Sequence, residues 1–345
     1  MSITENRKIL VFAHTGRKEA RDAARQACKQ LHSAGLVPVM NRSDLEALTE
    51  NWDDPVPVQV VHESVALIDI ELGMVLGGDG SILRAAEMVR HTSIPLIGVN
   101  LGHVGFLAES EESDLQETVD RIVKSEYAVE ERMAVDIEVW HEEKRVHTDW
   151  ALNEVSVEKG NREKMIEVII EVDRKPISTF GCDGVVIGTP TGSTAYAFSG
   201  GGPVVWPEVE AILLVPLSAH ALFARPLVAS PSSMVAVEMM AHGASGVLWC
   251  DGRRMNDLLP GSRIEVRKSE KPVLLARIHP APFSERLVRK FALPIRGWRG
   301  PTSEEEREAC DAGEKTVHKI LIDLYLVLTR KPNVWGAPTG SRSVQ

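Results

Sequence analysis

The amino-acid sequence predicts an α/β N-terminal domain with a parallel sheet, followed by a mostly β, β-sandwich-like C-terminal domain. Three observations lead to this fold class. Apolar runs alternate with helical patterns over the first third of the chain, as in βαβ units. From about Glu131, β-branched runs follow one another with almost no helical period between them. At 345 residues, the chain also exceeds the roughly 250–300 residues above which chains usually divide into domains.

The first domain is predicted from apolar strands and amphipathic helices in alternation. A Gly at residue 35 closes the first helix, and glycines follow the strand that ends near residue 76. The expected strands are 8–13, 36–40, 74–76 and 94–100, and the expected helices are 17–35, 81–90 and 114–127. A glycine cluster at the carboxyl end of a strand lies where open α/β sheets bind ligands.

The second domain is predicted from the β-branched runs "MAVDIEVW", "RVHTDWALNEVSV", "MIEVIIEVDRKPISTF" and "VVIGTP". We expect an α/β domain over 1–130 and a β-rich domain over 131–275. A closing segment over 276–300 returns to the first domain, and a polar tail over 301–345 carries a short apolar helix at 317–329. The alternatives are one continuous domain with an edge hairpin, and a tail helix that binds a partner or is loosely attached.

Composition limits the classes of function. The formal net charge of −10 argues against a general binder of nucleic acid or anionic membranes. Cys28, Cys182, Cys250 and Cys310 are too widely spaced for a CxxC motif, so we expect reduced thiols. The N-terminal apolar run is too short for a secretory signal, and no run reaches the roughly 18 apolar residues of a membrane span. These features predict a cytoplasmic protein without a membrane or nucleic-acid partner.

The stretch "GGDGS", residues 77–81, is the first candidate site. Its glycines let the backbone pass close to a bulky group and leave amide N–H groups free to bind an anion. Asp79 lies inside this anion site, where it would hold a cation beside a phosphate or take a proton from a hydroxyl group. The alternative for the glycines is a tight turn between strand and helix.

Three further stretches combine glycines with polar side chains. They are "NLGHVGFLAE" at 100–109, the pair Asn153–Glu154, and the Gly- and Thr-rich run 180–205 around Asp183. The chain contains neither a Walker A loop nor the G-x-G-x-x-G dinucleotide fingerprint, which weakens the case for a hydride-transferring Rossmann enzyme.

In this order, "GGDGS", "NLGHVGFL", "NE" and "DGVVIGTPTGSTAYAFSGGGP" closely resemble the NAD kinase family. The resemblance runs from about residue 8 to residue 300 and includes "HALFARPLV", "CDG" at 250–252 and a closing segment similar to that of actinobacterial members. It implies transfer of the terminal phosphoryl group of ATP, or of polyphosphate, to the 2′-hydroxyl of the adenosine ribose of NAD. The tail from Pro301 has no counterpart in the resemblance.

The resemblance assigns the donor side of the reaction to the glycine turn. Asp79 matches the family's catalytic aspartate and would accept the proton of the ribose 2′-hydroxyl. Gly77, Gly78 and Gly80 would bring amides to the donor phosphates, and Arg84 would neutralise phosphate charge. The alternatives are a helix cap for Asp79 and a solvated helix face for Arg84.

The resemblance assigns NAD contacts to the second half of the chain. Asn153, Glu154, Lys164 and Asp183 match NAD-contacting positions, and carboxylates suit ribose hydroxyls or an adenine amino group. The stretch "TAYAFS" would line the adenine and ribose pocket with Thr194, Ala195, Tyr196, Ala197, Phe198 and Ser199. His220 is expected to be structural, and Ser81 replaces a threonine that many relatives carry.

The expected cofactor is a divalent cation, Mg²⁺ or Mn²⁺, held by phosphate oxygens and water and not by a protein metal site. The resemblance also implies a homodimer or homotetramer. ATP versus polyphosphate, NADH as acceptor and feedback by NADP or NADPH stay open.

Two other classes of function compete. Lipid kinases and phosphofructokinases carry a similar glycine turn, but the chain shows no basic amphipathic helix or aromatic-basic patch for a membrane. A sugar-phosphate enzyme would need several Arg or Lys beside the acceptor, where this chain places Asn153, Glu154 and Asp183. A non-enzymatic NAD-sensing module would need the dinucleotide pocket but not Asp79.

Overall fold

The computed structural model describes residues 7–50, 52–101, 105–108, 110–111, 115–160, 164–222, 224–278 and 282–295. The expected apolar helix at 317–329 and the segment 102–104 of the second glycine loop lie outside these residues. The chain divides into two compact units, Met1–Phe283 and Ser284–Gln345. The described part of the second unit carries most of one helix, α6 (Phe283–Phe291).

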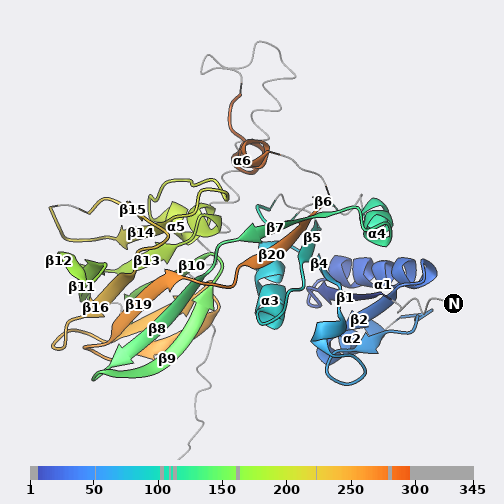
Figure 1. Ribbon diagram of the computed structural model, residues 1–345, viewed down its shortest axis with the longest axis horizontal. Coiled ribbons are helices and arrows are strands. Elements are labelled where there is room, and N and C mark those ends of the chain that lie inside the picture. The colour runs from blue at the N-terminus through green and yellow to red at the C-terminus, as the bar shows by residue number, and fades with distance from the viewer. Residues whose placement is uncertain are drawn as a thin grey trace, which may run out of the picture. The chain divides into compact units, whose positions relative to one another are not determined.

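The first part of the larger unit is an α/β domain whose sheet is mostly parallel (Figure 1). Among the described strands of this sheet, only β7 runs antiparallel to its neighbour, β20. In order across the sheet, the strands are β3 (Gln59–Val60), β2 (Val37–Met40), β1 (Lys8–Ala13), β4 (Leu72–Leu76), β5 (Leu96–Asn100), β20 (Val273–Arg277) and β7 (Ala128–Arg132), with β6 (Ser110–Glu111) also paired to β5.

Helices cover both faces of this sheet. Alternate residues of β1 face opposite sides: Ile9 and Val11 belong to the core under α1 (Lys18–Ser33) and α4 (Leu115–Val123), and Leu10 and Phe12 to the core under α3 (Asp79–Val89). A short helix, α2 (Arg42–Thr49), adds Leu48 to the first of these cores, and a 3₁₀ turn, η1 (Leu67–Asp69), packs Leu67 against the second. The strand order reverses between β1 and β4, so the glycine turn after β4 lies at the topological switch point, where ligands bind in such sheets.

The second part of the larger unit is a sandwich of two antiparallel sheets. One sheet contains β15 (Leu227–Ala229), β14 (Ile212–Leu217), β13 (Gly184–Gly188), β10 (Glu154–Lys159), β17 (Gly246–Cys250) and β18 (Arg254–Leu258). The other contains β12 (Lys175–Cys182), β11 (Ile166–Val172), β16 (Val235–Met239), β19 (Arg263–Lys268), β8 (Val135–His141) and β9 (Lys144–Ala151).

Apolar side chains of both sheets form one buried core, which is why these strands alternate in burial. Val135, Ile137 and Val139 of β8 face Val155 and Val157 of β10 within that core. The predicted fold class is therefore confirmed. The proposed division at residues 130, 275 and 300 stays a prediction.

Two other features bear on the sequence analysis. Cys28, Cys182 and Cys250 are buried free thiols, and burial raises the pKa of Cys28 to about 12. Cys310 lies outside the described residues. In the described part of the chain, no helix combines the length and the apolarity needed to span a bilayer.

Candidate functional site

The glycine turn begins where β4 ends and α3 starts. Gly77 adopts φ +152°, and a Cβ there would lie 2.4 Å from the Ser81 hydroxyl oxygen, so the turn requires glycine at this position. A Cβ built on Gly78 or Gly80 would meet no atom within 4 Å. The turn thus has space beside these two residues, where the sequence predicts donor phosphates.

The Asp79 carboxylate bonds to the second glycine loop. One oxygen accepts the backbone N–H of Phe106 and the other that of Leu107, both at 3.0 Å. The N-cap of α3 is Gly78, which offers no side chain. The contacts of Asp79 therefore differ from those of the helix-cap alternative, because the carboxylate reaches across to a neighbouring segment. The turn "GGDG" and the end of "NLGHVGFL" meet at this carboxylate.

Arg84 extends from α3 toward the end of β1. Its guanidinium carbon lies 5.1 Å from the centre of the Phe12 ring, and the side chain is half-buried. Asp44 is nearby: burial raises the pKa of its carboxyl, and the charge of Arg84 opposes that shift. Arg84 is thus more enclosed than a solvated helix face would be, and its contact with a donor phosphate stays a prediction.

The strand β10 presents a polar row on the face opposite the sandwich core. Val155 and Val157 point into that core, so the alternation of a strand places Glu154, Ser156 and Glu158 on the other face. The Ser156 hydroxyl donates to Glu158 at 2.6 Å. The sequence analysis missed Glu158, although the period of two in "NEVSVE" is the signal that finds it.

Glu154 is a buried carboxyl. Burial, and secondly the negative charge of Asp251, raise its pKa to about 8, while the Tyr196 backbone N–H, 3.4 Å from one carboxyl oxygen, acts in the opposite direction. The raised pKa favours the protonated form of Glu154, which can donate a hydrogen bond as well as accept one. Burial, together with the negative charge of Glu158, also raises the pKa of the Tyr196 hydroxyl.

The 3₁₀ turn η3 (Thr191–Thr194) packs directly on the residue before β10. A Cβ on Gly192 would lie 1.9 Å from the Asn153 carbonyl oxygen, so only glycine permits this approach. The Thr189 hydroxyl donates to the carbonyl of Leu152 at 2.6 Å. These contacts bring the predicted residues Asn153 and Glu154 together with the predicted run "TAYAFS".

The run from Thr194 to Ser199 does not share one environment. Thr194, Ala195 and Tyr196 are half-buried, whereas Ala197 is fully buried in a small cluster with Val186 and Val215. Phe198 and Ser199 at the end of α5 (Tyr196–Ser199) are exposed. Ala197 thus fixes the short helix to the sheet.

Asp183 forms an ion pair with Lys159, the last residue of β10. The hydrogen bond from Lys159 lowers the pKa of the Asp183 carboxyl. Ile166 pairs with Cys182 in the β11–β12 ladder, so the exposed Lys164 lies at the same end of that hairpin as Asp183. The sequence analysis named Lys164 and missed Lys159, which precedes a glycine and carries no motif.

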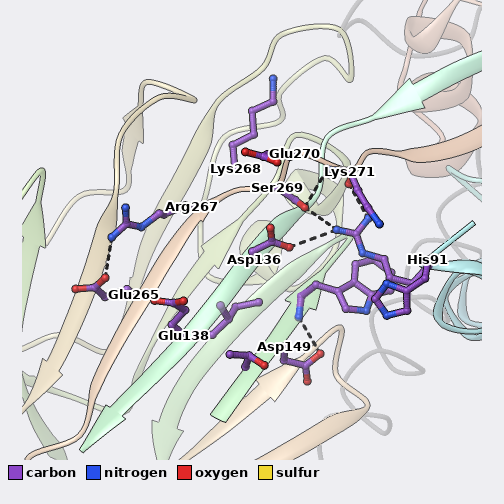
Figure 2. A pocket seen from close by; sticks show the side chains of 14 residues that line it. His91, Asp136, Glu138, Asp149, Glu265, Arg267, Lys268, Ser269, Glu270 and Lys271 are labelled. Carbon is purple, nitrogen blue, oxygen red and sulfur yellow. Dashed lines mark hydrogen bonds and ion pairs between the residues drawn. The ribbon is translucent and has the colours of Figure 1, made fainter. Parts of the chain in front are cut away.

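A cavity of about 880 Å³ lies elsewhere, beside β8, β9 and β19 (Figure 2). It is lined by Arg90, His91, Asp136, Ile137, Glu138, Thr148, Asp149, Trp150, Glu265, Arg267, Lys268, Ser269, Glu270 and Lys271. None of the predicted site residues lines it. Several of its charges neutralise one another, as in the pairs Arg90 with Asp136 and Arg267 with Glu265. We therefore place the candidate site at the glycine turn and the polar face of β10.

Comparison with known proteins shows the family to which the chain is related. Residues 9–127 match the ATP-NAD kinase N-terminal domain and residues 152–278 the ATP-NAD kinase C-terminal domain. The chain is 56% identical to an NAD kinase from Leifsonia xyli subsp. xyli over 300 residues, which cover 87% of this chain and 99% of the relative. It is 55% identical to NAD kinase 2 from Streptomyces coelicolor over 302 residues, which cover 86% of this chain and 99% of the relative.

Solved structures share the fold at lower identity. A yeast NADH kinase complexed with NADH superposes with a TM-score of 0.79 at 20% identity, covering 86% of this chain and 90% of the yeast chain. An NAD kinase from Archaeoglobus fulgidus in complex with ATP superposes with a TM-score of 0.63 at 24% identity, covering 84% of this chain and 100% of the archaeal chain. Since both family domains match and the relatives above 50% identity align over nearly their whole length, the chain belongs to the NAD kinase family of enzymes.

Proposed function

We propose that this chain transfers the terminal phosphoryl group of ATP to the 2′-hydroxyl of the adenosine ribose of NAD, with Asp79 as the general base. Membership of the NAD kinase family supports the reaction, and a related NAD kinase was solved with ATP, which supports ATP as the donor. The observation that carries the role of Asp79 is its carboxylate, held at the switch point by two backbone N–H groups.

The geometry suits a general base because two hydrogen bonds orient the Asp79 carboxylate and leave some of its lone pairs for a substrate. A carboxylate offers about four lone-pair positions, and the N–H groups of Phe106 and Leu107 occupy two. Among the described residues, no further donor occupies the remaining positions, and we propose that a ribose hydroxyl uses one of them. Phosphoryl transfer requires mainly positioning and charge neutralisation, so a fixed carboxylate beside open glycines meets the main requirement.

The acceptor side of the reaction is proposed on the polar face of β10. Asn153, Glu154 and Asp183 would contact NAD, with Tyr196 beside the adenine or ribose. Glu154 with its proton can donate to an acceptor atom of the ligand, and Asp183 as a carboxylate can accept from ribose hydroxyls.

A divalent cation, Mg²⁺ or Mn²⁺, is proposed to enter with ATP. The glycine turn offers one carboxylate among backbone amides, a donor set that fits a cation carried largely by phosphate oxygens and water. When bound, the cation neutralises charge on the phosphates. A homodimer or homotetramer also stays part of this proposal.

The test is the variant Asp79→Asn, which keeps the size of the side chain and one acceptor oxygen. NADP formation should fall about 10²-fold or more in kcat, because the base is lost. The dissociation constant for NAD, measured by calorimetry, should change little. Asp173→Asn is the matched control, since the Asp173 carboxylate also accepts a backbone N–H, from Met234 at 3.0 Å, but lies in the β11–β12 turn. An Asp79→Asn enzyme as active as Asp173→Asn would exclude the general base.

A further inference from the structure

The helix that carries Asp79 is attached to the β sandwich at its other end. Glu87, in the last turn of α3, accepts hydrogen bonds from Arg254 Nη1 at 2.5 Å and from Arg253 Nε at 3.1 Å. Arg90, which follows the helix, donates to the Ser269 hydroxyl and to the Lys271 carbonyl, each at 2.6 Å. Both ends of α3 are therefore held by hydrogen bonds. At the start, Asp79 bonds to the second glycine loop, and at the end, Glu87 and Arg90 bond to residues of the β sandwich and the segment after it.

The ring of Trp150, in β9, contacts two of these arginines. The guanidinium carbon of Arg90 lies 4.4 Å from the centre of its ring, and that of Arg254 lies 5.0 Å from it. Asp136 and Ser269 border the same cavity and bond to the Arg90 guanidinium (Figure 2). Such guanidinium–indole contacts add attraction that a lysine reproduces less well, because a guanidinium is planar and weakly hydrated.

Arg254 also links α3 to the residues that precede β10. It donates to Asp149 at 3.0 Å and lies 3.4 Å from the buried Asp251 carboxylate. Asp251 in turn accepts the backbone N–H of Asn153 at 2.7 Å and that of Leu152 at 3.0 Å. One guanidinium thus connects Glu87 of α3 with the carboxylate that holds the start of β10.

The turn between β17 and β18 makes this connection possible. Asp251 and Gly252 both have positive φ, 52° and 61°, and the N–H of Arg253 bonds to the carbonyl of Cys250. The two positive φ values and this hydrogen bond close a tight turn, for which Asp-Gly is a favoured sequence. The turn directs the Asp251 carboxylate to Leu152 and Asn153. Leu152 itself packs in the core that contains the buried residues of α3.

We propose that Arg254 is a positioning residue of the kinase reaction. It fixes the helix that carries Asp79 relative to Asn153 and Glu154, so that the base and the NAD-binding residues keep one separation. This proposal rests on the roles given above to those three residues. A helix of 11 residues transmits a displacement of one end to the other, and a shift of about 1 Å at a reacting group can cost about 10²-fold in rate.

The experiment compares Arg254→Lys with Arg263→Lys. Arg263 is a matched control: it also bonds to three carboxylates, those of Glu171, Glu238 and Glu265, but it joins strands of the sandwich and does not reach α3. Lysine keeps the charge and loses the planar fork of donors in both variants. We measure kcat, KM for NAD and for ATP, NAD binding by calorimetry, and the thermal midpoint.

Arg254→Lys should lower kcat at least about tenfold and leave the NAD dissociation constant within about threefold, while Arg263→Lys keeps the native kcat. A native kcat for Arg254→Lys, or an equal fall for both variants, would overturn the positioning role. Such results would leave the proposed function intact, because that is decided by NADP formation in the native enzyme and by Asp79→Asn.

Glu87→Gln gives a second test, and its result as a single variant does not depend on whether Arg254 variants fold. Glu87 is partly exposed at the end of α3, and the amide keeps the shape of the side chain. Glu87→Gln should also lower kcat, and the double variant with Arg254→Lys should lose no more than the larger single loss. If the two losses multiply, or if Glu87→Gln has native kcat, Arg254 does not act through α3.

Discussion

At the scale of single residues, the candidate site combines carboxyl groups in contrasting states. Burial raises the pKa of Glu154 to about 8 and also raises the pKa of Asp251, whereas the pKa of Asp183 is lowered by its hydrogen bond from Lys159. A protonated carboxyl and an ionised one can recognise different atoms of one ligand. Neighbouring carboxyl groups whose pKa values are driven apart are a common feature of functional sites.

The raised pKa of Glu154 makes folding stability depend on pH. In the unfolded chain its pKa is close to 4.5, so between about pH 4.5 and 8 the folded state holds more protons than the unfolded state. The contribution of Glu154 is therefore fully present below pH 4.5 and is lost as the pH rises through 8. The slope is at most about 1.4 kcal/mol per pH unit.

The variant Glu154→Gln tests this dependence, because glutamine is neutral throughout. The free energy of unfolding of the native protein should fall relative to that of Glu154→Gln as the pH rises from 5 to 9, measured by urea unfolding. A difference between the two proteins that does not change with pH would show that Glu154 titrates normally.

At the scale of elements, the glycines in the turn between β4 and α3 have different roles. Gly77 is required by the backbone, whereas Gly78 has free space beside it. Gly77→Ala forces a Cβ against Ser81 at a positive φ and should destabilise the protein by more than about 1 kcal/mol. The methyl group that Gly78→Ala adds would have no atom within 4 Å, so this variant should keep the native thermal midpoint. Its methyl group enters the space proposed for the donor phosphates, so KM for ATP should rise at least about tenfold. Native kinetics for Gly78→Ala would place the phosphates elsewhere.

Much of the fold was predictable because local patterns and tertiary structure agree. The apolar run "KILVFA" forms β1 over the same six residues, and Gly35 with φ +81° ends α1 as expected. The helix predicted from Ser81 begins at Asp79, because Gly78 serves as its N-cap. The sequence analysis missed α2, although Asn41 caps it by accepting the N–H of Asp44. So short a helix depends on tertiary contacts, such as that of Arg25 with the Leu48 carbonyl.

The site was predictable in part. The motifs predicted Asp79, Asn153, Glu154 and Asp183, and their roles stay predictions. The structure brings Asp79 to Phe106 and Glu154 to Tyr196. Lys159 and Arg254 could not be found from motifs, because their roles come from strand pairing and from a hairpin turn that only the folded chain brings near α3. Arg254 and Glu87 are 167 residues apart in the sequence, and a contact at such a distance leaves no local signal.

At the scale of the whole molecule, the proposed reaction assigns a separate role to each of the two domains. The α/β domain carries the glycine turn at its switch point, and the sandwich carries the polar face of β10. This division predicts different responses to metal removal. A chelator should abolish NADP formation, because the cation accompanies ATP, and Mg²⁺ should restore it. NAD binding, followed by calorimetry, should persist in the chelator, and its loss would indicate a cation bound at the NAD site.

The central claim is that this chain phosphorylates the ribose 2′-hydroxyl of NAD. The most direct measurement incubates the native protein with NAD, ATP and Mg²⁺ and locates the new phosphate by ³¹P nuclear magnetic resonance. The account predicts NADP with the phosphate on the 2′-oxygen of the adenosine ribose. Binding of NAD without NADP formation, with either ATP or polyphosphate as donor, would contradict it.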